Sequence, residues 1–189
     1  MHRLLEEYLR KHTNVTDEEI TAFAGKLRVQ NSKRGEILLE AGKICRCIYF
    51  VNKGCLRVYL MDKTGRESTR MLIPEGWFGT AFPSFILQEP SQAFIQSIEP
   101  SEVLTLTYQE FRSLSNTFPA WEKIYLANLE QSYIASIKRI ESLITMNAKE
   151  RYALFMNDSP ELVQRLPSKI IADYLGISQE TLSRLKSKI

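Results

Sequence analysis

The side chains with the clearest chemical potential lie near the end of the 189-residue chain. Gln179, Glu180, Ser183 and Arg184 are spaced so that a single helix would present all four on one face. Glutamine and arginine can form paired hydrogen bonds with the edges of adenine and guanine, and glutamate can accept one from cytosine. A helix face of this composition could therefore read bases in the major groove of DNA.

Two short predicted helices would position this face. We expect Ser168 to cap the first helix, Gly176 to supply a tight turn and Ser178 to cap the second helix. The residues at the contact between the helices would be Ile171, Ala172, Leu175, Ile177, Thr181, Leu182 and Leu185. This pattern predicts a helix-turn-helix, and a generic helical hairpin with a solvated polar face stays open as the alternative.

The charge of the chain agrees with a polyanionic partner at this end. From Arg165 to Ile189 there are five basic residues against two acidic ones, so this segment carries +3, which equals the net charge of the whole chain. The basic excess lies where DNA would bind, and Ser168, Lys169, Ser178, Thr181, Lys186 and Lys188 join the reading face as candidate DNA contacts.

Other residues that could do chemistry form no recognisable site. Cys45, Cys47 and Cys55 lie in a stretch that is expected to form strand, and a spacing of one residue does not suit a zinc knuckle. His2 and His12 lie in the N-terminal helical region. We expect the cysteines to be structural thiols, no metal to be bound and the chain not to be an enzyme, because it contains no Ser-His-Asp, Cys-His, HExxH or Walker arrangement.

The composition is that of a globular protein. Hydrophobic residues make up 44% and charged residues 25% of the chain, and no window holds eighteen uninterrupted apolar residues. We therefore expect no signal peptide, no membrane span and no membrane partner. Three cysteines that cannot all pair within one chain favour a reducing, cytoplasmic location.

Short strand-like runs punctuated by glycine fill the first part of the chain. They cover 37–39, 48–51, 56–60, 69–73, 93–95 and 103–106, with turn signals about every ten residues, which predicts an antiparallel roll. Thr16 is expected to cap a preceding helix that runs through Ile20, Phe23 and Leu27.

One long helix is predicted from Trp121 to Met146, where no glycine interrupts the sequence. Two apolar stripes run along it, and a second stripe suggests contact with another chain. We favour a parallel homodimer over a helix buried on both sides within a monomer. The first stripe is Leu126, Leu129, Tyr133, Ile140 and Leu143, and the second is Trp121, Ile124, Ile134, Ile137 and Ile144.

The order of these motifs resembles that of the Crp/Fnr family of bacterial transcription regulators. The resemblance rests on Gly35-Glu36-Ile37-Leu38, Gly54-Cys55-Leu56-Arg57, Pro74-Glu75-Gly76-Trp77-Phe78-Gly79 and Ile171-Ala172-Asp173-Tyr174-Leu175-Gly176-Ile177-Ser178. It implies an α+β fold: a cyclic-nucleotide-binding-like, jelly-roll-like β-roll over 1–118 with flanking helices, a dimerisation helix over 119–147 and a helix-turn-helix domain over 148–189. It also implies a near-palindromic double-stranded DNA site, RNA polymerase as a partner, and base contacts by Gln179, Glu180 and Arg184.

The effector site that the resemblance implies is degenerate. Its positions fall on Gly79, Thr80, Ala81, Ser91, Gln92, Ala93, Ser136 and Ile137. Cyclic-nucleotide binders of the family carry a glutamate for the ribose and an arginine for the phosphate, where this chain has Thr80 and Ser91. We therefore expect no tight binding of cyclic AMP. The apolar loop from Thr80 to Pro90 leaves another small effector open, and no cofactor is indicated; three cysteines are too few for a four-cysteine iron-sulfur cluster.

The sequence ends at Ile189, close to the end of the predicted reading helix. We expect the two-stranded wing that follows this helix in most relatives to be absent, which would remove contacts to the DNA backbone. An alternative function is therefore a dimeric sensor, binding a ligand or a protein, whose shortened C-terminal domain no longer binds DNA.

Overall fold

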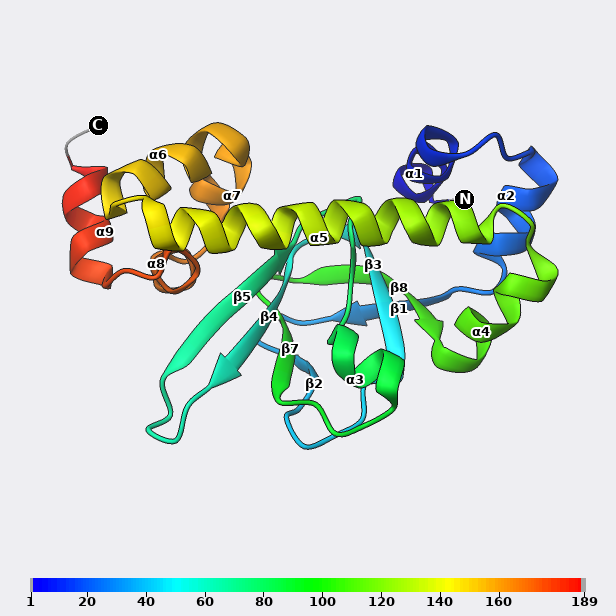
Figure 1. The fold of residues 1–189 in the computed structure, drawn as a ribbon, viewed down its shortest axis with the longest axis horizontal. Helices are drawn as coiled ribbons and strands as arrows, with labels where there is room; N and C mark the ends of the chain where they lie inside the picture. Colours follow the sequence, from blue (N-terminus) through cyan, green and yellow to red (C-terminus); the bar gives the residue numbers. More distant parts are fainter. Residues whose placement is uncertain (1, 188–189) are drawn as a thin grey trace.

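The computed structural model describes residues 2–187. Helices α1 (Arg3–His12) and α2 (Asp17–Ala24) precede a β-roll, and the long helix α5 (Trp121–Thr145) connects the roll to the C-terminal helices at the opposite end of the molecule (Figure 1). Within the described part of the chain, no helix combines the length and apolar character needed to cross a membrane.

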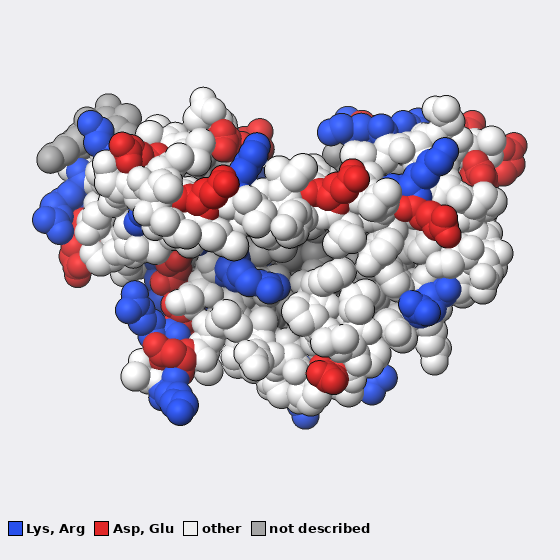
Figure 2. All heavy atoms as spheres, viewed as in Figure 1, with Lys and Arg blue, Asp and Glu red and all other residues white. Residues whose placement is uncertain are grey.

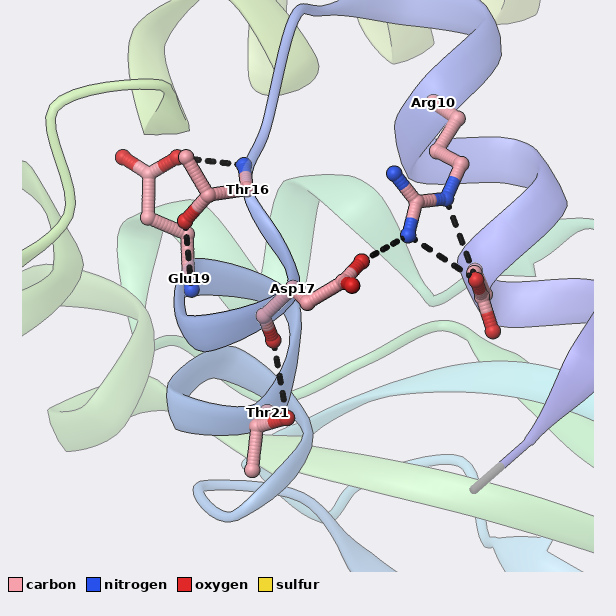
Figure 3. A network of polar contacts seen from close by, with 6 residues as sticks. Arg10, Thr16, Asp17, Glu19 and Thr21 are labelled. Carbon is pink, nitrogen blue, oxygen red and sulfur yellow. Dashed lines mark hydrogen bonds and ion pairs between the residues drawn. The ribbon is translucent and has the colours of Figure 1, made fainter.

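The start of α2 is fixed by a capping box, as predicted. Thr16 Oγ1 accepts a hydrogen bond from the backbone nitrogen of Glu19 at 3.2 Å, and the Glu19 carboxylate accepts one from the nitrogen of Thr16 at 2.9 Å. Figure 3 shows Arg10 reaching from α1 to Asp17 beside this cap. The helix ends at Ala24, so the predicted inclusion of Leu27 is wrong.

The roll consists of two antiparallel four-stranded sheets, ordered β1-β8-β3-β6 and β2-β7-β4-β5. The predicted runs all lie in strands, and the fold class is confirmed. Two strands were not predicted, because β1 has polar residues without alternation and β6 has only two residues. The strands are β1 (Arg28–Ser32), β2 (Ile37–Leu39), β3 (Cys47–Lys53), β4 (Leu56–Met61), β5 (Glu67–Ile73), β6 (Phe78–Gly79), β7 (Ala93–Ser97) and β8 (Ser101–Thr107).

Two sequence expectations about this region need correction. The segment predicted as a loop after Thr80 contains a short helix, α3 (Phe82–Leu87), which Pro83 favours near its start and which ends at Gln88 in the left-handed conformation. Of the three cysteines, only Cys47 lies in a strand; Cys45 and Cys55 flank β3 and are buried.

Aromatic packing joins the roll to the start of α5. Helix α4 (Tyr108–Thr117) carries Phe111, whose ring lies 5.3 Å from that of Trp121, and Phe23 stacks against Phe118 at 5.4 Å. Trp121 and Ile124 are buried in this core, whereas most of the later apolar residues of α5 are exposed. The core therefore anchors only the first turns of the long helix.

Four short helices follow α5: α6 (Ala148–Asp158), α7 (Pro160–Arg165), α8 (Ser168–Leu175) and α9 (Gln179–Lys186). They share a second core, to which the roll contributes Cys55 and Ile98. This core places the C-terminal helices against the roll as well as at the end of α5. The buried residues of these helices, together with Leu166 between α7 and α8, are Tyr152, Phe155, Leu162, Ile171, Ala172, Leu175 and Leu182.

Candidate nucleic-acid interface and effector site

Helices α8 and α9 form the predicted helix-turn-helix geometry. Gly176 connects them with φ of 65°, a left-handed conformation that glycine adopts at little cost. Ser178 caps α9, since its hydroxyl accepts a hydrogen bond from the nitrogen of Thr181 at 3.1 Å. Ile177 is half-buried and packs against the second core.

The predicted cap at Ser168 is wrong. Pro167, with its fixed φ, occupies the N-cap position, and its carbonyl accepts from the nitrogens of Ile170 and Ile171. Ser168 is thus the first helical residue, and its hydroxyl accepts a hydrogen bond from Lys186 Nζ at 3.0 Å. This contact brings the start of α8 beside the end of α9.

The predicted reading face of α9 is exposed, while Leu182 behind it is fully buried. Arg184 Nε lies 3.4 Å from the Glu180 carbonyl oxygen, so this side chain runs back along its own helix. Exposed side chains at this surface are Ser168, Lys169, Ser178, Gln179, Glu180, Ser183, Arg184 and Lys186; Thr181 is half-buried, and Lys188 lies outside the described residues.

Part of the basic excess that the sequence assigns to this end faces the roll. Lys169 Nζ lies 3.7 Å from the Glu67 carboxylate of β5, and Arg165 pairs with Glu75 and Glu99. Basic and acidic side chains accordingly intermix over the C-terminal helices in Figure 2. The sequence gives no sign of these pairs, because the partners are about 65 to 100 residues apart.

The apolar stripes of α5 are open after its first turns. Leu126, Tyr133, Ile140 and Leu143 of the first stripe are 43–66% exposed, and Leu129 is half-buried. Ile134, Ile137 and Ile144 of the second stripe are exposed as well. These exposed residues contradict the alternative of a helix buried on both sides within one chain. Along the middle of α5 the surface is largely uncharged (Figure 2).

The two residues that replace the expected effector anchors are buried, and their hydroxyls are used within the roll. Thr80 Oγ1 donates to the Cys47 carbonyl at 2.9 Å, and Ser91 Oγ donates to the Ala93 carbonyl at 2.9 Å. Ala93 returns a backbone hydrogen bond to Ser91 Oγ at 3.0 Å. Gly79 and Ala81 are also buried, and Gln92 is exposed.

The effector positions on α5 stand apart from those of the roll. Ser136 and Ile137 are exposed, and the Ser136 hydroxyl donates to the Ser132 carbonyl of its own helix at 2.8 Å. Among residues 2–187, no hydrogen bond joins either residue to Thr80 or Ser91. A cavity of about 20 Å³ does lie between the roll and α5, room for about one water molecule, but its lining is Ile48, Phe78, Leu106, Phe111, Trp121, Ile124, Tyr125 and Asn128.

Comparisons with known proteins agree with this architecture. A family model described as the cyclic nucleotide-binding domain matches residues 29–118. The chain is 25% identical to the anaerobic regulatory protein of Pasteurella multocida over 83% of this chain and 61% of that protein. It is 21% identical to the cAMP-activated global transcriptional regulator CRP of the same organism, over 89% of this chain and 86% of that protein.

A solved structure of CLP, a c-di-GMP responsive global regulator of Xanthomonas campestris, shares the fold with a TM-score of 0.74. The identity is 16%, and the match covers 92% of this chain and 91% of that chain. The chain spans 61–63% of the length of the first curated relatives that it matches. These relatives are regulators, which agrees with the expectation that the chain is not an enzyme. Residues 29–118 thus match the cyclic nucleotide-binding domain family, and the β-roll, the long helix and the C-terminal helical region follow one another in the order of the Crp/Fnr regulators that the chain resembles.

Proposed function

We propose that the chain is a sequence-specific, DNA-binding transcription regulator. The observation that carries this proposal is the helix pair α8–α9: the outward face of α9 presents Gln179, Glu180 and Arg184, while Leu182 is buried behind them. The side chains that we assign to base edges are these three, and those assigned to the DNA backbone are Ser168, Lys169, Ser178, Thr181, Ser183, Lys186 and Lys188.

The working form is a homodimer built on α5. The exposed apolar stripes of this helix need a partner, and a second copy of the chain supplies a matching helix. Two reading helices related by twofold symmetry would enter successive major grooves about 34 Å apart, so the site would be a near-palindrome. We place the dimer in the cytoplasm, with residues 1–118 as the sensor, 148–189 as the DNA-binding domain and RNA polymerase as the protein partner.

The regulator acts without cyclic AMP. Thr80 and Ser91 lack the charges that would hold a ribose hydroxyl and a phosphate, and both hydroxyls already bond to the roll's own backbone. A charged phosphate brought into such a site would lose its hydration without gaining an ion pair. Another small effector is compatible with this reasoning.

The test is selection of genomic DNA fragments by the purified protein at a fixed salt concentration, with and without cyclic AMP. We expect enrichment of one near-palindrome in both conditions. Enrichment only with cyclic AMP would refute the assignment of the effector site. A protein that enriches nothing, although it is folded and dimeric, would refute DNA binding and favour the sensor function, for which the engagement of Arg165 and Lys169 with the roll is the supporting observation.

A control variant sharpens this selection. Replacing Gln179, Glu180 and Arg184 together with alanine removes the assigned base contacts and leaves the buried face of α9 intact. This variant should lose the enriched motif while it keeps weak, salt-sensitive binding to all fragments.

A further inference from the structure

The C-terminal helices dock on the roll through a mixed apolar and charged surface. The apolar part contains Cys55 and Ile98 of the roll, neither more than 3% exposed, packed among the helical residues of the second core. The charged part surrounds it. We call it the docking cluster, and it consists of Arg57, Glu67, Glu75 and Glu99 from the roll and Arg165, Lys169 and Asp173 from the helices.

Arg165 is the most connected helical residue of the docking cluster. Its Nε lies 3.1 Å from Glu99 Oε1, and its Nη2 donates to both the Glu75 carboxylate and the Gly54 carbonyl. Gly54 directly precedes the buried Cys55. The Arg165 side chain, at the end of α7, thus contacts two carboxylates and the backbone of the β3–β4 turn.

The other contacts of the docking cluster involve α8. Asp173 Oδ2 lies 3.9 Å from Arg57 Nη1, while Arg57 itself is 4% exposed and bonds to Glu67 and Gln96 within the roll at 2.8 Å. Lys169 Nζ faces Glu67. The first helix of the helix-turn-helix therefore directs two charged side chains at β4 and β5.

This interface is held together incompletely. Glu99 Oε1 and Asp173 Oδ2 are buried, and each has an arginine nitrogen nearby, at 3.1 Å and 3.9 Å, but neither accepts a well-aligned hydrogen bond from a described residue. A buried carboxylate oxygen that has an ion pair but no well-aligned hydrogen bond contributes less to its contact than one that has both. Burial also raises the pKa of Asp173 despite the nearby Arg57. A surface of this kind can be exchanged for another set of partners.

We propose that the docking cluster is a latch: it holds the C-terminal helices on the roll, turns Lys169 toward Glu67 instead of DNA phosphates, and must open for full DNA affinity. The inference rests on the proposed function, since it assigns Lys169 to the DNA backbone. A DNA phosphate near Lys169 would meet the like charge of Glu67, so docking and DNA contact at this residue exclude each other.

The test uses a roll variant that removes both ion pairs of Arg165 without touching the DNA-binding surface: Glu75→Gln together with Glu99→Gln. Glutamine at 75 keeps an acceptor for the Gly54 nitrogen, which donates to Glu75 Oε1 at 2.8 Å, so the turn is retained. The matched control is Glu40→Gln with Glu89→Gln. It makes the same change of net charge at two exposed positions of the roll.

Cys55 reports the opening directly. Burial raises the pKa of its thiol to about 12, so in the docked form it reacts slowly with a maleimide at pH 8. Peptide mass spectrometry then gives the labelling rate of each cysteine. In the variant with Glu75→Gln and Glu99→Gln, which we call the latch variant, we expect Cys55 to be labelled at least about tenfold faster than in the wild type. Cys45, buried in the core of the roll, serves as the internal control for global unfolding and should stay protected.

DNA binding is measured in parallel, at one salt concentration, with the selected duplex or a pool of genomic fragments. The latch variant should bind more tightly than the charge-matched control. Labelling of Cys55 at the control rate would overturn the latch. Faster labelling without tighter binding, in a protein whose wild type binds DNA, would show that the docked form is the DNA-binding form. Faster labelling with no DNA binding by any variant would support the docking of the C-terminal helices by this cluster, and would refute both the proposed function and the role of the latch in it.

Discussion

At the scale of single residues, Arg184 and Lys186 are predicted to contribute to DNA binding in different ways. Arg184→Ala should cost about 1–3 kcal/mol at one base pair of each half-site and relax the preference there. Lys186→Ala should weaken binding to all sequences about equally and reduce the salt dependence. Affinities for a panel of duplexes with single base changes, measured at several salt concentrations, separate the two effects. Equal losses on every duplex for both variants would mean that α9 does not read bases.

Gly176 is predicted to be essential to the turn between α8 and α9. Its φ of 65° would strain any residue with a Cβ, and an added Cβ would stand 3.2 Å from Leu143 Cδ2. Gly176→Ala should therefore destabilise the C-terminal helices by about 1–2 kcal/mol. Gly25→Ala is the control, because Gly25 has an ordinary φ of −65° and room for a Cβ. Denaturant unfolding should show a loss only for Gly176→Ala, and an equal result for both would contradict the strain.

At the scale of elements, α5 is predicted to hold the dimer together. Ile140 is 52% exposed in the single chain, and Ile140→Glu would place a charge in an apolar interface. We expect this variant to sediment as a monomer with unchanged helix content. Lys138→Gln alters the net charge by the same amount on the same helix and should remain dimeric. A dimeric Ile140→Glu variant would mean that the subunits associate through another surface.

The elements that could be predicted from the sequence are those whose own residues carry the signal. Local sequence was sufficient to predict the strands rich in β-branched and aromatic residues, the glycine-free helix α5 and the turn at Gly176. The strand β1 was missed because its sequence, RVQNS, is polar and pairs with β8, about seventy residues away. The cap at Ser168 failed because Pro167 already takes that position. Pairs such as Arg57 with Asp173 leave no periodic trace in the sequence, so the exposed polar face of α9 was predictable and the docking of α7 and α8 on the roll was not.

At the scale of the whole molecule, cyclic AMP is predicted to leave thermal stability unchanged. A ligand that binds only the folded state at one hundred times its Kd adds about 2.7 kcal/mol, which would raise Tm by several degrees. At 1 mM cyclic AMP we expect no rise for this chain. The cAMP-activated regulator of Pasteurella multocida, measured alongside, is the positive control. A clear rise in Tm would show that Thr80 and Ser91 do not prevent binding.

Leu143 lies where the apolar stripe of α5 meets the helix-turn-helix. It belongs to the exposed apolar stripe of α5 and also lies against Gly176, while Arg139, one turn earlier, donates to the Tyr174 carbonyl and stacks on its ring. In the proposed dimer, the same helical turn would therefore meet both the second subunit and the helix-turn-helix. Subunit association and DNA binding would then be linked equilibria, and each would strengthen the other by the same factor. The amount of protein in the cell would itself act as an input signal, because a modest rise in concentration would increase dimers and occupied sites together, without any small ligand.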